Sequence, residues 1–291
     1  MPIKTEKFSS PIKLIECPRD AMQGLHDFVP TELKIAYLNL LLQVGFDTLD
    51  FGSFVSPKAI PQMRDTEEVL AGLDLAGTTK LLAIVANLKG VESAVKHPEI
   101  TYLGFPFSIS ETFQQRNTNS SIAQSLKTVE DMLNLCEKYH KEAVVYLSMG
   151  FGNPYGDEWN TDIVSHWANE LVQKGVKIIS IADTVGVSTP EKIREIIPPL
   201  VQQFPNVEFG LHLHSTPQQR LEKIEAAFSA GCTRMDSALK GFGGCPMAAD
   251  DLTGNIATED VISYLSSKGV QLNLDMERWG EAMMVSSKIF D

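Results

Sequence analysis

The chain has 291 residues, 43% of them hydrophobic and 21% charged, a globular composition that excludes disordered and collagen-like proteins. Its 37 acidic residues outnumber its 25 basic ones, and the formal net charge is −12. A surface of that sign repels phosphate backbones and anionic lipids, which argues against nucleic acid and membranes as partners. The length fits two small domains or one large one, since α/β barrels reach roughly 250 residues as a single domain.

The cysteines and the N-terminal segment indicate a compartment. Cys17, Cys136, Cys232 and Cys245 show no CxxC spacing, which favours a reducing environment over a secreted disulfide framework. Residues 1–10 lack both an apolar core and an Arg-rich amphipathic leader, and no later segment approaches roughly 18 consecutive apolar residues. We therefore expect a cytoplasmic protein without a transmembrane helix.

Eight short apolar segments have the composition of buried parallel strands. They are rich in Ile, Val, Leu and Tyr, and Gly, Pro, Asn or Asp stand near their ends. In chain order they cover residues 12–16, 48–52, 80–86, 101–105, 143–148, 177–182, 207–213 and 233–237.

Helical patterns fill the intervals between these strands. One apolar stripe recurs at steps of three and four residues, through Ile122, Leu126, Val129, Leu133 and Cys136. Thr189 and Pro190 are typical of a helix cap and first turn, and Pro198 is expected to kink or end that helix. Near the C-terminus, Thr258 is expected to cap another helix.

The alternation of eight strands with helices predicts an α/β fold of the (β/α)₈ TIM-barrel type, with an open doubly wound sheet as the alternative. No linker rich in Pro, Gly or Ser interrupts the alternation, so residues 1–291 are interpreted as one domain. The barrel is expected over about residues 10–254, followed by a short C-terminal helical extension over about residues 255–291.

Polar residues gather at the predicted carboxyl ends of the strands, where barrels of this type carry their active sites. In chain order they are Arg19, Asp20, Asp50, Asn87, Ser148, Asp183, His212, His214 and Asp236. The Arg19–Asp20 pair follows the first strand, where an arginine can oppose negative charge that develops during a reaction. A surface ion pair is the alternative.

The segment LHLHS indicates a metal site. His212 and His214 are two apart, so in a strand their side chains point to the same face and can address one ion. Asp20 offers a carboxylate and Asn255 a side-chain carbonyl, which completes a ligand set suited to Mg²⁺, Mn²⁺, Fe²⁺ or Zn²⁺. The alternative is a pair of hydrogen-bonded structural histidines.

A glycine-rich segment with a cysteine, GFGGCP at 241–246, follows the last strand. Its glycines permit a mobile loop that could bring Cys245 to the active-site rim for proton transfer. The alternative is a tight turn with a passive cysteine. Cys136 and Cys232 are expected in the core.

Seven motifs occur in the order found in one enzyme family. They are PRD-x-x-Q at 18–23, SFVSPK-x-x-PQM at 53–63, NLKG at 87–90, ADTVGVSTP at 182–190, HxH at 212–214, GFGGCP at 241–246 and GNIATED at 254–260. With them the chain resembles 3-hydroxy-3-methylglutaryl-CoA lyases over about residues 12–265. These lyases belong to a superfamily of metal-dependent barrels that also includes isopropylmalate, homocitrate and citramalate synthases.

The resemblance implies cleavage of 3-hydroxy-3-methylglutaryl-CoA, or a close 3-hydroxyacyl-CoA, to acetyl-CoA and acetoacetate by a retro-Claisen step. It implies one divalent cation, for which Mg²⁺ or Mn²⁺ is expected before Zn²⁺ or Fe²⁺. It also implies a homodimer. The implied metal ligands are Asp20, His212, His214 and Asn255. The implied catalytic residues are Arg19, Asp20, His212 and Cys245. Residues expected to bind or orient the substrate are Gln23, Asp50, Ser148 and Asp183.

The sequence also departs from the family pattern. Cys17 and Ala21 stand where the family has glycine, Asp50 where it has Glu, and Ser215 where it has the Asp that follows HxH. Three alternative functions stay open: a Claisen-condensing synthase of the same superfamily, a metal-dependent hydrolase, and a non-catalytic relative that binds an acyl-CoA or a metal.

Overall fold

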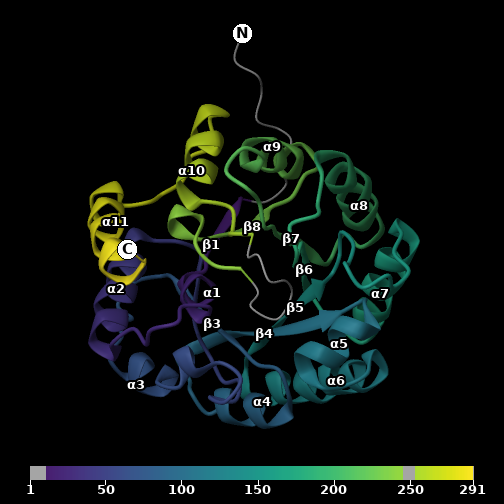
Figure 1. The fold of residues 1–291 in the computed structure, drawn as a ribbon, viewed down its shortest axis with the longest axis horizontal. Coiled ribbons are helices and arrows are strands. Elements are labelled where there is room, and N and C mark those ends of the chain that lie inside the picture. The colour runs from purple at the N-terminus through teal and green to yellow at the C-terminus, as the bar shows by residue number, and fades with distance from the viewer. Residues whose placement is uncertain (1–10, 245–252, 291) are drawn as a thin grey trace.

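The protein is a closed barrel of eight parallel strands surrounded by helices (Figure 1). The computed structural model describes residues 11–244 and 253–290. The strands follow chain order around the barrel, and pairing of the last strand with the first closes it. They are β1 (Lys13–Glu16), β2 (Thr48–Ser53), β3 (Lys80–Ile84), β4 (Ile100–Ser108), β5 (Glu142–Ser148), β6 (Ile178–Ala182), β7 (Glu208–His212) and β8 (Arg234–Ser237). The TIM-barrel prediction is confirmed.

Most of the helices form a ring outside the strands (Figure 1). They are α1 (Pro18–Gln23), α2 (Thr31–Val44), α3 (Thr66–Ala71), α4 (Leu88–Ala94), α5 (Glu111–Thr118), α6 (Ile122–Tyr139), α7 (Thr161–Gln173), α8 (Pro190–Gln203), α9 (Arg220–Ser229), α10 (Thr258–Ser267) and α11 (Met276–Phe290). Short 3₁₀ turns, η1 (Pro61–Met63) and η2 (Leu239–Gly241), follow β2 and β8. No described helix is long and apolar enough to span a membrane.

Three local predictions need correction. Strand β4 runs to Ser108 instead of ending at 105, because the buried Phe105 and Phe107 keep the segment in the sheet on either side of Pro106. Helix α8 does not end at Pro198 but continues to Gln203. Thr258 does not cap α10, because its hydroxyl is hydrogen-bonded to Glu16 instead.

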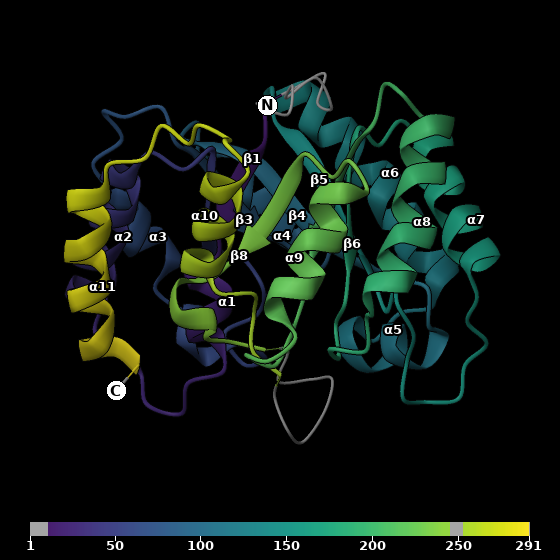
Figure 2. The same cartoon turned by 90° about the horizontal axis from the view of Figure 1, so that it is seen from above.

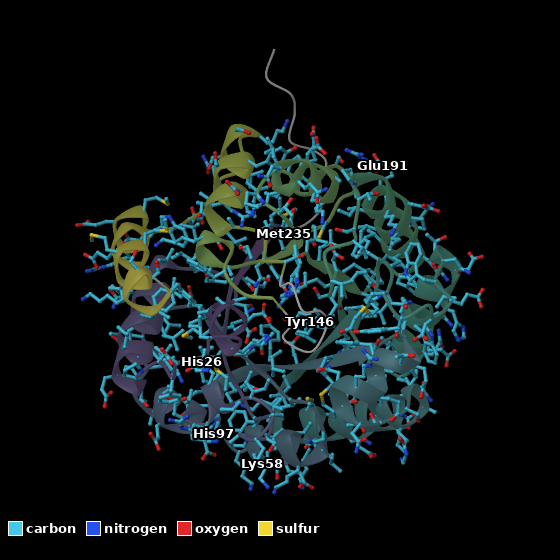
Figure 3. All side chains as sticks on the ribbon, in the orientation of Figure 1. His26, Lys58, His97, Tyr146, Glu191 and Met235 are labelled. Atoms are coloured by element: carbon cyan, nitrogen blue, oxygen red, sulfur yellow. The ribbon has the colours of Figure 1, made fainter. Side chains whose placement is uncertain are left out.

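The core has two layers. The larger layer lies between the strands and the helices and contains the apolar stripe of α6, including Val129 and Cys136. A smaller cluster fills the barrel interior and includes Tyr102 and Tyr146. In Figure 3, Tyr146 lies near the barrel axis, whereas His97 lies at the periphery of the molecule. The interior cluster supports the floor of the site described below.

The C-terminal helices pack against the barrel, which confirms a helical extension. Helix α11 lies beside α2 in Figures 1 and 2, and Trp279 meets Phe46 edge to face, with the ring centroids 5.9 Å apart. At the end of α11, Phe290 packs on Tyr37 and stacks on Phe242, with centroids 6.3 Å and 4.4 Å apart. Helix α11 therefore contacts the segment that follows β8. That the whole chain forms a single domain stays a prediction.

Candidate active site

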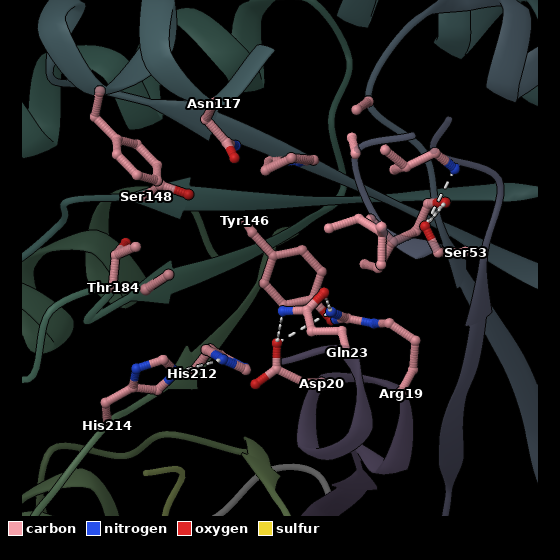
Figure 4. A pocket seen from close by; sticks show the side chains of 18 residues that line it. Arg19, Asp20, Gln23, Ser53, Asn117, Tyr146, Ser148, Thr184, His212 and His214 are labelled. Carbon is pink, nitrogen blue, oxygen red and sulfur yellow. Dashed lines mark hydrogen bonds and ion pairs between the residues drawn. The ribbon is translucent and has the colours of Figure 1, made fainter. Parts of the chain in front are cut away.

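A pocket of about 150 Å³ opens at the carboxyl ends of the strands (Figure 4). One side of it is polar and carries most of the residues that the sequence analysis singled out. Among its polar lining residues are the predicted Arg19, Asp20, Gln23, Ser148, His212 and His214, together with Ser53, Asn117, Tyr146 and Thr184. The other side is apolar and includes Ile60, Ile84 and Phe113. A polar floor with an apolar wall can hold an acyl group and keep water away from it.

Arg19 and Asp20 reach the pocket because the chain turns into a short helix directly after β1. Pro18 is at the start of α1, where its missing N–H costs no hydrogen bond, and the next two residues are 6% exposed. Arg19 Nη1 lies 3.0 Å from Asp20 Oδ1 and 2.8 Å from Gln23 Oε1. Gln23 Nε2 donates to Asp20 Oδ1 at 2.9 Å. The turn therefore presents one cation, one carboxylate and one amide as a hydrogen-bonded unit.

The two carboxylates beside Arg19 have opposite pKa shifts. Burial raises the pKa of Asp50 to about 6, because it outweighs the favourable charge of Arg19. Burial also acts on Asp20, but the charges of Arg19, His212 and His214 outweigh it and lower the pKa to about 2. Asp20 is thus the carboxylate that stays ionised at the pocket floor, and Asp50 lies behind Arg19.

His212 and His214 converge on Asp20. Their Nε2 atoms lie 3.2 Å apart, and one ligand atom from each of Asp20, His212 and His214 lies within 4.8 Å of the others. His212 ends β7, and His214 forms an isolated bridge with Asn255 in the segment before α10. Two imidazoles and an ionised carboxylate at this spacing fit a divalent cation.

The protonation of the two rings differs because their surroundings differ. Burial lowers the pKa of His214 to about 4, and the neighbouring charge of His212 adds to that effect. Burial also opposes the charge of His212, but the hydrogen bond that its Nδ1 donates to Asp236 and the charge of Asp20 outweigh it and raise the pKa. A proton donor on one ring and an acceptor on the other account for the short Nε2–Nε2 contact.

Asn255 joins the cluster from a distant part of the chain. Its Nδ2 donates to Asp20 Oδ2 at 2.7 Å and to the Phe242 carbonyl at 2.8 Å. The second bond identifies this atom as the nitrogen, because a carbonyl only accepts. Coordination of a cation by Asn255 would use its oxygen, so its place in the ligand set stays a prediction.

Gly243 shows why glycine stands in the segment before Cys245. Its φ is +103°, and a Cβ there would lie 2.6 Å from Asn255 Nδ2 and 2.9 Å from the Asp20 carbonyl oxygen. Glycine is therefore required at 243, because only a residue without a Cβ lets the backbone come this close to Asn255 and Asp20. Cys245 itself lies outside the described residues.

Asp183 does not line the pocket, although Ala182 and Thr184 on either side of it do. Its carboxylate accepts hydrogen bonds from the backbone of Val187 and from Ser188, and Lys223 lies 3.3 Å away. Lys223 also donates to the His214 carbonyl at 2.7 Å. Asp183 therefore holds the turn after β6 and reaches His214 only through Lys223.

The sequence analysis left three residues out of the site. Asp236 was noted at a strand end, and its Oδ2 lies 3.2 Å from His212 Nδ1. Tyr146 lines the pocket and meets the His212 ring edge to face at 5.7 Å. Lys223 is buried on α9. Asp236 carried a usable signal, because a charged residue in a buried strand requires a partner.

Comparisons with known proteins agree with this geometry. Residues 12–285 match the HMGL-like family model. The cytoplasmic 3-hydroxy-3-methylglutaryl-CoA lyase of Rattus norvegicus is 33% identical over 274 residues, which cover 93% of this chain and 79% of the rat protein. The hydroxymethylglutaryl-CoA lyase YngG of Bacillus subtilis (strain 168) is 32% identical over 90% of this chain and 87% of its own.

Solved structures give the same result. The HMG-CoA lyase of Bacillus subtilis superimposes with a TM-score of 0.90 at 30% identity and covers 97% of this chain and 95% of its own. An HMG-CoA lyase from Acinetobacter baumannii, in complex with coenzyme A and 3-methylmalate, has a TM-score of 0.89 at 29% identity. The match covers 96% of this chain and 91% of the Acinetobacter chain. On this evidence, the chain belongs to the HMGL-like family.

Proposed function

We propose that this protein is a divalent-metal-dependent carbon–carbon lyase that cleaves 3-hydroxy-3-methylglutaryl-CoA to acetyl-CoA and acetoacetate. The observation that carries the proposal is the convergence of Asp20, His212 and His214 within 4.8 Å, beside Arg19 on the pocket floor. Relatives of 33% and 32% identity are named as lyases of this substrate, which favours the lyase over the synthase alternative.

In this proposal Asp20, His212, His214 and Asn255 would hold the cation. When bound, it would supply positive charge that polarises the hydroxyl and carboxylate oxygens of the substrate. Carboxylate and amide oxygens suit Mg²⁺ or Mn²⁺, which we propose as the ion, while the imidazoles also admit Zn²⁺ or Fe²⁺.

Arg19 would stabilise the enolate that forms as the C2–C3 bond breaks. Loss of the hydroxyl proton turns C3–OH into the ketone of acetoacetate, and the bonding electrons of C2–C3 move onto the thioester oxygen of the acetyl-CoA enolate. Nε and Nη2 of Arg19 are held by Asp50, and Nη1 contacts Asp20 and Gln23. A guanidinium fixed in this way needs little reorganisation when charge develops on the substrate.

Proton transfer would need a group that takes the hydroxyl proton and a group that returns a proton to the enolate. Asp20 is the ionised carboxylate at the pocket floor, and the hydroxyl proton would leave toward it. Cys245 would return a proton to C2 of the enolate. The apolar wall with Ile60, Ile84 and Phe113 would exclude water from that enolate until it is protonated.

The substrate side of the proposal is an acyl-CoA, with Gln23 and Ser148 in the pocket to orient it. The complex of the Acinetobacter baumannii lyase with coenzyme A supports this. We also propose a cytoplasmic location and a homodimer. The rat and human relatives named as cytoplasmic support the location, although other relatives are named as mitochondrial.

The test is an assay of the purified protein with 3-hydroxy-3-methylglutaryl-CoA. Acetyl-CoA and acetoacetate should appear in equal amounts. Their formation should stop after treatment with a chelator and resume when Mg²⁺ or Mn²⁺ is added. Condensation of acetyl-CoA with a 2-oxo acid would identify a synthase instead. Release of free coenzyme A without acetoacetate would identify a hydrolase.

A further inference from the structure

Asp20, His212 and His214 form the pocket cluster. A second group of side chains of metal-binding types lies on the other side of His212 from it. One ligand atom from each of Cys17, His212 and Asp236 lies within 4.8 Å of the others, and all three residues are buried. They come from neighbouring strands: His212 pairs with Asp236 in the barrel register, and the Cys17 backbone N–H donates to Ser237 of β8. A thiol, an imidazole and a carboxylate thus meet at one point inside the barrel.

The hydrogen bonds of this group are incomplete. Asp236 Oδ2 contacts His212 Nδ1 at 3.2 Å, but its Oδ1 has no partner among the described residues, although the side chain is 0% exposed. Cys17 Sγ makes a long contact of 3.8 Å to the carbonyl oxygen of Ile15. A buried carboxylate oxygen without a partner is costly, and a cation would satisfy it.

We propose that Cys17, His212 and Asp236 form a second cation site, which takes a thiophilic divalent ion such as Zn²⁺ or Cd²⁺. The thiol would bind as a thiolate and release its proton to solvent, and with the Asp236 carboxylate it would balance both charges of the ion. His212 would contribute Nδ1. Cys17 stands where the resembled family has glycine, so the thiol is a feature of this chain.

Occupation of this site disables His212 as a ligand on its other side. A neutral imidazole has one lone pair, so a cation on Nδ1 leaves Nε2 protonated. The Nε2 atom is the one that faces His214 and the pocket. A thiophilic ion at the second site therefore competes with the cation of the pocket cluster, and lyase activity falls. This inhibitory consequence rests on the proposed function, whereas binding itself does not.

Binding is tested with Cd²⁺ on chelator-treated protein by the ultraviolet absorption of the cadmium–thiolate bond. A Cys245→Ser background removes the thiol of the GFGGCP segment. In that background the band should appear, and Cys17→Ser should weaken binding by more than about 100-fold, since even loss of a group that only hydrogen-bonds a ligand costs about 10–100-fold. Cys232→Ser, in which another buried thiol is removed, should bind Cd²⁺ normally.

Two further measurements keep the result decisive. If the Cys17→Ser variant unfolds, the experiment is repeated with Cys17→Ala. Melting temperatures verify that each variant is folded. A crystal soaked in Cd²⁺ should show anomalous density between Cys17 Sγ and His212 Nδ1. A band that persists in Cys17→Ser, or one lost in Cys232→Ser, would overturn the proposal.

The inhibitory consequence is tested in the lyase assay with Mn²⁺ as the activating ion. Wild type should be inhibited by Cd²⁺ in competition with Mn²⁺, and Cys17→Ser should keep its basal activity but need at least about tenfold more Cd²⁺ for half-inhibition. Equal inhibition of both proteins would contradict the coupling through His212. If Cys17-dependent Cd²⁺ binding is found but no lyase activity in any condition, the proposed function fails while the second site stands.

Discussion

The guanidinium of Arg19 lies against the carboxylate of Asp50, with Nη2 2.5 Å from Oδ2 and Nε 3.1 Å from both oxygens. The pair joins the turn after β1 to strand β2, and both side chains are almost fully buried. Asp50 therefore fixes the plane of the guanidinium, while Nη1 remains directed at Asp20 and Gln23. The positive charge of Arg19 is therefore held at a fixed position in the pocket.

Replacing Arg19 with Met should slow cleavage while leaving metal binding intact. The lost stabilisation of the enolate should cost roughly 3–5 kcal/mol, somewhat more than loss of one neutral oxyanion donor. Because the charge develops during cleavage, the loss should appear mainly in kcat, measured under saturating substrate. Arg278→Met, on exposed α11, is the control. An unchanged kcat with a raised KM would make Arg19 a substrate anchor instead.

Replacing Asp20 with Ala should weaken cation binding as well as cleavage. The pocket cluster consists of Asp20 and the two imidazoles of His212 and His214. Removing the Asp20 carboxylate therefore removes its negatively charged ligand. Titration of the apo protein with Mn²⁺ should show affinity reduced by more than about 100-fold. Asp27→Ala, whose side chain is fully exposed, should bind Mn²⁺ as wild type does. Normal Mn²⁺ affinity in Asp20→Ala would place the cation elsewhere.

Glu16 links three segments around the site. Its Oε1 accepts a hydrogen bond from the Leu239 backbone, and its Oε2 is hydrogen-bonded to the Thr258 hydroxyl, which accepts when Glu16 carries its proton. Burial raises the pKa of its carboxyl from 4.5 to about 8, and the charge of Glu259 adds to that effect. The charge of Glu16 in turn raises the pKa of two buried neighbours, Tyr37 and Cys17, on which burial has the larger effect. Near neutral pH the folded protein therefore holds Glu16 in its protonated form.

Glu16→Gln should remove a pH dependence of stability. Between pH 4.5 and about 8 the unfolded chain ionises Glu16 while the folded chain keeps the proton, so stability falls as pH rises across this range. Glutamine retains an acceptor for Leu239 and a donor toward Thr258 but does not titrate. Melting temperatures from pH 5 to 9 should show the variant gaining on wild type as pH rises. Exposed Glu222→Gln is the control, and parallel curves for wild type and Glu16→Gln would disprove the account.

The sequence was sufficient to predict the barrel because each strand is short, apolar and bounded by turn residues. It also indicated the pocket cluster, since residues at the carboxyl ends of parallel strands meet at one rim. Arg19, Asp20, His212 and His214 do meet there. Their roles in binding the cation and in catalysis stay predictions.

What could not be predicted depends on contacts across the barrel. The bond between His212 and Asp236 joins residues on different strands, and no local pattern indicates which carboxylate orients which ring. Asp183 was placed near the substrate from its position after β6, but the turn that follows uses its oxygens. Thr258 was expected to cap a helix, yet Glu16, distant in the sequence, competes for its hydroxyl. Tertiary partners overrode local preference in the last two cases.

Phe290→Ala should loosen the segment after β8. Phe290 stacks on Phe242, whose carbonyl accepts from Asn255, and Asn255 donates to Asp20. Loss of two aromatic contacts should cost about 1–3 kcal/mol of stability and should weaken Mn²⁺ binding through Asn255. Met284→Ala, exposed on the same helix, is the matched control. If Phe290→Ala melts earlier but binds Mn²⁺ normally, the contact stabilises α11 without positioning Asn255.

Cys245→Ser separates the lyase from its alternatives. Serine keeps the size and a hydroxyl, but its pKa is far above the roughly 8.5 of a thiol, so it is a poorer proton donor to the enolate. Cleavage should slow by about 10²–10⁴-fold with near-normal substrate binding, the usual range for a general acid–base residue. A synthase or hydrolase should tolerate the change, and a variant with full lyase activity would rule out proton transfer by Cys245. Alkylation should inactivate wild type, and bound substrate should protect it, whereas Cys136 and Cys232 are buried and should not react.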